Sequence, residues 1–388
     1  MGIYVAYYLL QMGKLGRYIF YQVAGAAFMT VALFVFVLVL GNIFKSVIDE
    51  LISGRIDFAF FVKVVSLIIP AVIPYSLPMG MLTGILLVFG RMSAQSEIVA
   101  MKACGRSIYS MIAPVFLLAI IASGISLYIN FYYAPKASYE YKNAIKNVIR
   151  KNPIQFIQAG KFVKDFPGYV IYANGTETSA NILNGFSLWQ LNNKNEVVAS
   201  FKSDKATVSY NSKTDEIIFV LENVHIPRSK NEFMSCEKID VKIPLSEAFG
   251  ESRNEVKKPK RMTFDELWQA RHTWHKIPLE KLPPEQRAER IARDRIEINL
   301  QIQKNIAMAF SIFSLVVLAV PLGIKASRSE TFVNLAIAIS LAMTYYMMTV
   351  FISWLEKYPD VRPDILIWLP NFIFQGVGMY LIIRASKH

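Results

Sequence analysis

The stretch GILLVFGRMSAQSEIVAMKACGRS, residues 84–107, joins two long apolar runs through a short polar segment. Its middle, residues 93–104, has the pattern of a short amphipathic helix, because Ile98 and Met101 recur at the spacing that places side chains on one helix face. Gly105 stands where a glycine commonly ends a helix. A helix held between two membrane spans can pass force from a soluble partner to those spans.

The composition is that of a membrane protein. Of the 388 residues, 54% are hydrophobic, which exceeds the roughly 45–50% of soluble globular domains. The formal net charge of +13 would also suit a nucleic-acid-binding protein. In membrane proteins, however, Lys and Arg collect on cytoplasmic flanks and near anionic lipid. We therefore expect a membrane protein without a nucleic-acid partner.

Six apolar stretches are long enough to cross a bilayer as helices, which takes about 20 residues. More Lys and Arg flank their ends on the side of the N-terminus than on the other side, and this bias predicts that both termini lie in the cytoplasm. The large region between the third and fourth spans is then extracytoplasmic. The predicted spans are residues 18–41, 64–90, 108–129, 306–324, 331–355 and 365–383.

Short runs rich in β-branched and aromatic residues fill the region from about residue 160 to 247. Strands this short fit a sandwich, a jelly roll or a partly open barrel. The predicted fold class is a membrane α-helical protein with six transmembrane helices plus an extracytoplasmic all-β, jelly-roll-like domain. Examples of the predicted strands are residues 169–172, 186–191, 206–210, 217–221 and 224–226, with turns at Asn174-Gly175, Asn184-Gly185 and Asn192-Asn193.

The spans divide the chain into three predicted parts. Residues 1–130 form the N-terminal membrane half, residues 131–303 the extracytoplasmic domain with flanking helices, and residues 304–388 the C-terminal membrane half. Thr263 and Glu266 have the spacing of a helix capping pair. The charged segment that follows is expected to be helical and to continue into the fourth span.

Pro70, Pro74 and Pro78 follow at four-residue spacing within the second span. Each removes a helical hydrogen bond, and membrane helices tolerate this where neighbours or water satisfy the freed carbonyls. The series fits a deformable helix that lines a pathway, and it fits a static bend needed for packing equally well. In the sixth span, Gly376 and Gly378 are expected to allow close helix contact.

The sequence lacks the signatures of an enzyme. It has no phosphate-binding loop, so energy from ATP would come from a partner. Its four His form no metal-binding set, and we expect no catalytic residue, metal or cofactor. No Asp or Glu lies inside a predicted span, which argues against ion-coupled transport. Cys104 and Cys236 fall on opposite sides of the membrane, so no disulfide between them is expected.

Three segments carry a family resemblance. SEIVAMKACG at residues 96–105, AVPLG at 319–323 and WLPN at 368–371 resemble recurrent patterns of the lipopolysaccharide-export permeases. On these patterns the chain is identified as a member of the LptF/LptG family, also called YjgP/YjgQ, over nearly its whole length. The resemblance implies a permease subunit of an ATP-driven ABC exporter that extracts lipopolysaccharide from the bacterial inner membrane.

The resemblance also implies partners: a cytoplasmic ATPase dimer, a paralogous six-span permease subunit, a single-span periplasmic bridging subunit, a periplasmic bridge protein and lipopolysaccharide. The β domain is then periplasmic. Residues 91–106 correspond to the coupling helix, and Glu97 to the acidic residue that contacts the ATPase. A lone carboxylate can pair with donors of a partner, although by itself it also fits a solvated surface charge. The residues implied for ATPase coupling are Arg91, Glu97, Met101 and Arg106.

Lys45 lies where the family places a basic residue near the lipid phosphates, at the outer end of the first span. A point charge suits a phosphorylated glycolipid, and a cation at this depth also serves as an interfacial anchor. Asn42 stands where some members carry another cation, so that charge is missing here. The apolar faces of spans one and five would line the acyl-chain cavity. The implied lipid-binding residues are Lys45, Phe34, Leu38, Tyr345 and Met348.

Two other functions fit the same layout. One is a permease for another lipid or for a lipoprotein, and the other is a non-transporting membrane scaffold whose β domain recruits periplasmic proteins. A scaffold needs no coupling helix, so Glu97→Ala should leave it working. An exporter should lose transport, or the activity of its ATPase, on the same change.

Overall fold

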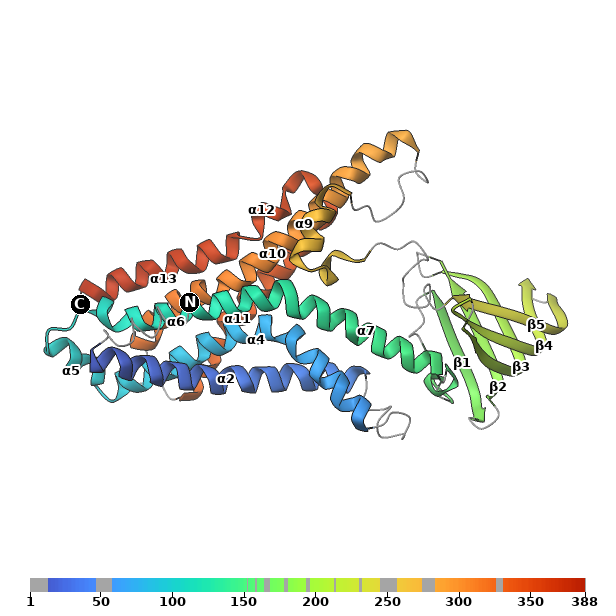
Figure 1. Ribbon diagram of the computed structural model, residues 1–388, viewed down its shortest axis with the longest axis horizontal. Helices are drawn as coiled ribbons and strands as arrows, with labels where there is room; N and C mark the ends of the chain where they lie inside the picture. The colour runs from blue at the N-terminus through green and yellow to red at the C-terminus, as the bar shows by residue number, and fades with distance from the viewer. Residues whose placement is uncertain are drawn as a thin grey trace. The chain divides into compact units, whose positions relative to one another are not determined.

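The computed structural model describes residues 13–46, 58–151, 153–157, 159–163, 168–177, 181–192, 196–212, 214–229, 232–244, 257–273, 283–325 and 331–387. The chain forms two compact units, one made of residues up to 139 and from 257 onward, the other of residues 140–256. The first unit holds the long helices and the second the sheet (Figure 1). The predicted division of the chain at residues 130 and 303 stays a prediction.

Six described helices are long and apolar enough to cross a membrane, which confirms the predicted helical part of the fold. The third does not end at the predicted boundary, because a π-helical segment, η1 (Ile129–Tyr133), joins it to α7 (Ala134–Lys151). The fourth continues the preceding charged helix without a break, as predicted. The six are α2 (Lys14–Ser46), α4 (Phe58–Ala94), α6 (Ile108–Tyr128), α10 (Pro284–Lys325), α11 (Thr331–Trp354) and α13 (Leu369–Lys387).

α4 passes through its three prolines as one helix of 37 residues. It packs against α2 through Gly84, where an added Cβ would lie 2.7 Å from the backbone of Ala27, and through Gly80, where it would meet Val31. Small residues that let backbones approach are the usual contact between membrane helices. This contact was not predicted, although the glycines stand four residues apart in the sequence.

The sixth span differs from the prediction at its start. α12 (Pro363–Leu366) ends and α13 begins three residues later, so the predicted helix from residue 365 is interrupted. Pro370 has no N–H to continue the helical ladder, and this explains a break here. Gly378 makes the predicted close contact, because its Cβ would lie 2.8 Å from the backbone of Val317, whereas a Cβ at Gly376 meets no described atom of this chain within 4 Å, so close contact there stays a prediction.

A buried hydrogen-bond network joins α10, α11 and α13. Asn371, which is fully buried, accepts hydrogen bonds from Ser314 (3.0 Å) and from the Tyr345 hydroxyl (3.2 Å). Its amide nitrogen donates to the carbonyl of Ala307 (3.0 Å), and Gln375 donates to Ser314 (3.0 Å). Polar groups removed from water must find such partners, so the network fixes the register of the three helices.

Four shorter helical elements lie against α10, near its middle: η3 (Pro259–Arg261), α9 (Phe264–Thr273), η5 (Leu355–Lys357) and η6 (Pro359–Val361). The predicted capping pair is confirmed, because the backbone N–H of Thr263 donates to the Glu266 carboxylate at 2.8 Å. Burial opposes ionisation of Glu266, but hydrogen bonds from Lys257 and Thr263 outweigh it and lower the pKa of this carboxyl. The start of α9 is therefore held by a charge-assisted cap.

The second unit contains one antiparallel sheet of five strands in chain order, which confirms the predicted β domain. The predicted strands at 217–221 and 224–226 are one strand, and the last strand, which is polar, lies within the predicted β-rich region but was not named as a strand. Ala159 and Val163 add isolated bridges to the first strand. A short helix, η2 (Pro153–Phe156), precedes the sheet. The strands are β1 (Tyr169–Glu177), β2 (Ile182–Leu191), β3 (Val197–Asn211), β4 (Glu216–Ser229) and β5 (Glu232–Pro244).

Two of the predicted turns were wrong. Asn174-Gly175 lies inside β1 and Asn184-Gly185 inside β2. These strands pair so that Gly175 faces Asn184. Gly185 has φ +60°, and an added Cβ there would clash with Asn174. Gly185 therefore allows a local distortion of the pairing between β1 and β2, and it does not mark a turn.

Arg150, near the end of α7, is bound to the hairpin between β3 and β4. Its guanidinium donates two hydrogen bonds of 3.0 Å to Asp215, which also accepts one from the Tyr210 hydroxyl at 2.6 Å. Burial opposes ionisation of Asp215, but the bonds from Arg150 and Tyr210 outweigh it and lower the pKa of Asp215. This bidentate pair fastens the helix to the sheet within the second unit.

Candidate functional site

α5 (Glu97–Ala103) connects α4 to α6 and is the short helix expected from the sequence. It starts later than predicted, because α4 runs to Ala94 and Ser96 reverses the chain with φ 59°. Its end is as predicted. Gly105, at φ +78°, donates to the carbonyl of Lys102 (2.9 Å), and the next residue donates to Met101 (3.1 Å). This pair of bonds is a Schellman motif, which terminates the helix.

One face of α5 is packed against the membrane unit. Ile98 is 3% exposed and Met101 9% exposed, and both belong to the core that α4 and α6 contribute to. The opposite face consists of small or apolar side chains that are open, with Val99 64% exposed and Ala100 and Ala103 also exposed. Met101 therefore holds α5 in place, and the opposite face is the one available to a partner.

The predicted coupling charges lie beside the first turns of α2. The Tyr18 hydroxyl donates to the Glu97 carboxylate at 3.3 Å, and Arg91 donates to the side-chain oxygen of Gln22. Arg106 is exposed next to the end of α5. Tyr18 and Gln22 were not predicted as part of this site. Their four-residue spacing indicates a shared helix face, but their partners lie 79 and 69 residues away in the chain.

The α5 segment is also bound to the C-terminal ends of two other spans. Ser93, in the last turn of α4, donates to the carbonyl of Ile324 at the end of α10 (2.7 Å). Lys102 donates to the carbonyl of Ala385 at the end of α13 (3.5 Å), where a cation suits the free carbonyls of a helix end. A displacement of α5 would therefore act on α2, α4, α10 and α13 together.

The residues implied for lipid binding differ in their burial. Phe34, Leu38 and Met348 are half-buried, whereas Tyr345 is 1% exposed and belongs to the buried network. Lys45 lies in the last turn of α2, where only the backbone is described. Both spans also expose further apolar side chains. The exposed side chains are Phe28, Met29, Leu33, Phe36 and Val37 on α2, and Met343, Met347, Val350, Phe351 and Trp354 on α11.

A second cationic site was not predicted. A pocket of about 460 Å³ is lined by Lys258, Lys260 and Lys304, together with Glu297 and Glu356. Lys304, on α10, donates to the Ser353 hydroxyl of α11 at 3.1 Å. The pocket adjoins the exposed α11 face at Val350 and Trp354. Positive charge beside an apolar helix face is suited to an amphipathic anion.

These features agree with a comparison to known protein families. The family model for the lipopolysaccharide export system permease LptF/LptG matches residues 17–384. The chain belongs to the LptF/LptG family. It is therefore a transmembrane permease of lipopolysaccharide export in the inner membrane, and not itself an enzyme. A comparison with curated proteins found no match.

Proposed function

We propose that this permease is the membrane subunit of an ATP-driven ABC exporter, and that α5 is where a cytoplasmic ATPase dimer drives it. The single observation that carries the proposal is the construction of α5. One face is anchored in the core by Ile98 and Met101, the other is open, and the segment is bonded to the ends of α10 and α13. A surface loop without a coupling role needs none of these bonds.

The open face of α5 supports contact with a groove of the ATPase. Its side chains are small, so a partner can approach the helix closely. Glu97 stands at its start, in reach of an Arg or of backbone donors. Arg91 and Arg106 flank the same segment and would add contacts of the opposite charge. Met101, on the buried face, would hold α5 against the spans.

The exposed faces of α2 and α11 support the pairing with a paralogous six-span permease. Contiguous apolar surface on two spans of one unit is suited to a partner helix or to acyl chains. Between the paired subunits, Phe34, Leu38 and Met348 would contact the acyl chains at the edge of these faces. The burial of Tyr345 assigns it the role of holding α11 in position.

Cations near the outer ends of the spans would hold the phosphorylated head of the lipid. Lys45 and the pocket around Lys304 are the candidates, because ammonium groups are common phosphate ligands. In this orientation both termini are cytoplasmic and the β domain is periplasmic. The β domain would then deliver lipopolysaccharide to the single-span bridging subunit and the periplasmic bridge protein.

The proposal is tested by Glu97→Arg in the tagged, full-length permease. We expect the variant to recover about tenfold less ATPase than the wild type from membranes in mild detergent, because a charge-assisted contact becomes a repulsive one. Recovery of the second permease should be unchanged. The matched control is Glu140→Arg, which makes the same charge change at an exposed site on α7.

Mass spectrometry of the recovered material separates the alternatives. Lipopolysaccharide bound to the wild type supports the exporter, whereas a different lipid or a lipoprotein would replace the proposed cargo. If the wild type recovers no ATPase, or if Glu97→Arg recovers as much as Glu140→Arg does, the coupling role of α5 is refuted.

A further inference from the structure

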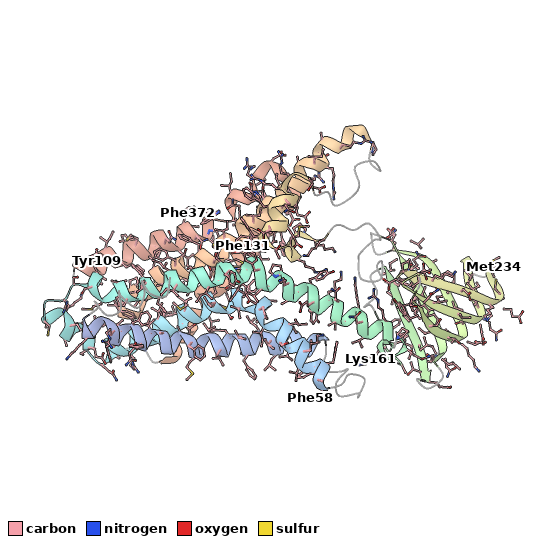
Figure 2. The ribbon with its side chains drawn as sticks, in the orientation of Figure 1. Phe58, Tyr109, Phe131, Lys161, Met234 and Phe372 are labelled. Atoms are coloured by element: carbon pink, nitrogen blue, oxygen red, sulfur yellow. The ribbon has the colours of Figure 1, made fainter. Side chains whose placement is uncertain are left out.

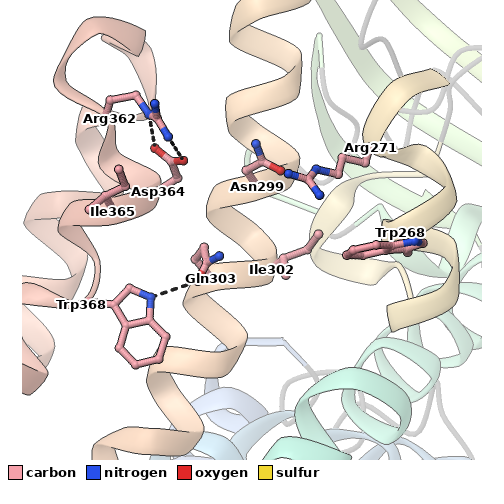
Figure 3. Close-up of a pocket in the computed structure, with 9 residues that line it drawn as sticks. All are labelled: Trp268, Arg271, Asn299, Ile302, Gln303, Arg362, Asp364, Ile365 and Trp368. Carbon is pink, nitrogen blue, oxygen red and sulfur yellow. Dashed lines mark hydrogen bonds and ion pairs between the residues drawn. The ribbon is translucent and has the colours of Figure 1, made fainter.

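A pocket of about 420 Å³ lies between α9, α10 and the segment that begins α12 and α13 (Figure 3). It is separate from α5 and from the cationic pocket around Lys304, and none of its residues was implied for coupling or lipid binding. Its walls combine two cations, two indole rings and two amides. They are Trp268, Arg271, Asn299, Gln303, Arg362 and Trp368, with Asp364 and two isoleucines completing the lining.

The pocket carries one positive charge without a counter-charge among the described residues. Arg362 is neutralised by Asp364, through two hydrogen bonds of 3.1 Å. Arg271 forms no ion pair with any residue that the structure describes. Its guanidinium lies over the ring of Trp268, 5.5 Å from the ring centre, and this contact orients it. Figure 3 shows Arg271 pointing toward Asn299 across the pocket.

Two amide side chains, those of Gln303 and Asn299, line the same space, and the Asn299 oxygen is turned toward Arg271 (Figure 3). The Trp368 indole N–H donates to the side-chain oxygen of Gln303 at 3.0 Å. This bond fixes the orientation of the Gln303 amide group, because its oxygen accepts from Trp368. The amide nitrogen remains available to donate to a ligand. In the part of the chain that the structure describes, neither this nitrogen nor the Asn299 amide bonds to a protein group. A planar guanidinium with the amide donor of Gln303 matches the oxygens of a phosphate ester, and the Asn299 oxygen can accept a hydrogen bond from the guanidinium or from a hydroxyl of the head group.

Exposed apolar side chains of α13 follow directly after the pocket residue Trp368. The ring of Trp368 stacks on that of Phe372, with centroids 6.3 Å apart, and Phe372 is 62% exposed on the outward side of the helix (Figure 2). Ile365 and Leu369 are exposed on the same surface. Indole rings that flank a polar pocket above apolar side chains are typical of the membrane–water interface. The site therefore has separate places for a charged head and for hydrocarbon.

We propose that this pocket binds the head group of an anionic glycerophospholipid. The phosphate would lie at Arg271 and the Gln303 amide, beside Asn299, and the acyl chains along Leu369 and Phe372. A volume of about 420 Å³ is near the lower end for ligand pockets, which span about 300–1,000 Å³. It suits a single glycerophosphate. Because none of its lining residues is among those implied for cargo binding, the bound lipid would be a resident of the permease and not its cargo.

The test measures the melting temperature of the purified full-length permease in neutral detergent while one lipid is titrated in. A ligand that binds only the folded protein raises this temperature once its concentration exceeds the Kd, and the rise then grows with the logarithm of the concentration. We expect phosphatidylglycerol to raise the melting temperature in this way and phosphatidylcholine to leave it unchanged. Arg271→Gln should weaken the apparent affinity for phosphatidylglycerol about tenfold or more, because a charged hydrogen-bond partner is lost.

Arg293→Gln is the matched control, because Arg293 lies on α10 outside the pocket and forms a surface ion pair with Glu289. It should keep the wild-type affinity. Asn299→Ala provides a second variant that leaves the contact between Arg271 and Trp268 intact, and it should weaken binding several-fold. An equal response to phosphatidylcholine, or full affinity in Arg271→Gln and Asn299→Ala, would overturn the proposal. A response to lipopolysaccharide alone, lost in Arg271→Gln, would overturn the proposed occupant and make the pocket a cargo site.

Discussion

Within the membrane unit, the N-terminal helices α2 and α4 pack by one kind of contact, and the C-terminal helices α10, α11 and α13 pack by another. α2 and α4 meet over Gly80 and Gly84, where the backbones approach closely and the Thr30 hydroxyl donates to the Gly80 carbonyl (2.7 Å). α10, α11 and α13 meet over the hydrogen bonds of Asn371. A glycine contact depends on side-chain volume, while an amide network depends on the direction of its hydrogen bonds. The glycine contact therefore excludes a larger side chain but allows one helix to slide along the other. The amide network fixes the register of its helices.

Gly84→Leu should break the first kind of contact and have the largest effect. The new side chain would begin 2.7 Å from the backbone of Ala27, where no rotamer can avoid the overlap. Overpacking of this type costs about 3 kcal/mol, and we expect a melting temperature lowered by several degrees or a protein that cannot be purified as a single species. Gly124→Leu on α6 is the control, because its Cβ meets nothing within 4 Å. Equal melting temperatures for the two variants would contradict the assigned packing.

Asn371→Leu should break the second kind of contact with a smaller effect. It removes the acceptor for Ser314 and Tyr345 and the donor to Ala307. Individual hydrogen bonds between membrane helices contribute about 0.6 kcal/mol on average, so a loss of about 1–2 kcal/mol in the free energy of unfolding is expected. Combining it with Tyr345→Phe in a double-mutant cycle measures the coupling. Simple additivity of the two changes would show that the network does not act as a unit.

The ion pair between Arg150 and Asp215, in the second unit, is a third kind of contact. Its loss should lower the free energy of unfolding less than either of the two changes above. Both side chains are about 40% exposed, at 38% and 40%, so the pair should contribute less than about 1 kcal/mol. The pKa of Asp215 is lower in the folded protein than in the unfolded chain. Its contribution is therefore present above the unfolded pKa, near 4, and is lost as the pH falls through the folded pKa.

Asp215→Asn gives the measurement for this pair. Amide hydrogen exchange in β4 should be faster in the variant than in the wild type at neutral pH, and the difference should narrow at acidic pH. High salt should narrow it as well, because the pair is accessible to solvent. A difference that persists unchanged in acid would show that Asp215 acts through its shape and not through its charge.

Much of the membrane unit could be predicted because lipid imposes a simple rule on sequence. Uninterrupted apolar runs must be helices, and the six spans followed from this. The β unit was harder. β5, from Glu232 to Pro244, alternates charged and apolar residues without a turn signal and was not named as a strand. The pair Asn174-Gly175 suggested a turn, but strand pairing overrides local preference there.

The candidate site was predictable to the extent that it is local. The burial of Ile98 and Met101 and the cap at Gly105 follow from spacing within twelve residues. The contacts of Glu97 with Tyr18, of Ser93 with Ile324 and of Lys102 with Ala385 join segments that are 79, 231 and 283 residues apart. No periodicity encodes such distances. The pocket around Arg271 is of the same kind, since its walls come from three separate elements.

The length of α10 has a mechanical consequence. At 1.5 Å per residue, its 42 residues extend about 63 Å, roughly twice the hydrocarbon thickness of a bilayer. About half of this rod therefore projects beyond the membrane as a lever. A tilt of about 10° at the base moves the tip of a 30 Å arm by about 5 Å. One end of the lever is bonded to the α5 segment through Ile324, and the two cationic pockets lie along its other half. A displacement of α5 would thus change the shape of the pockets around Lys304 and Arg271 at the same time.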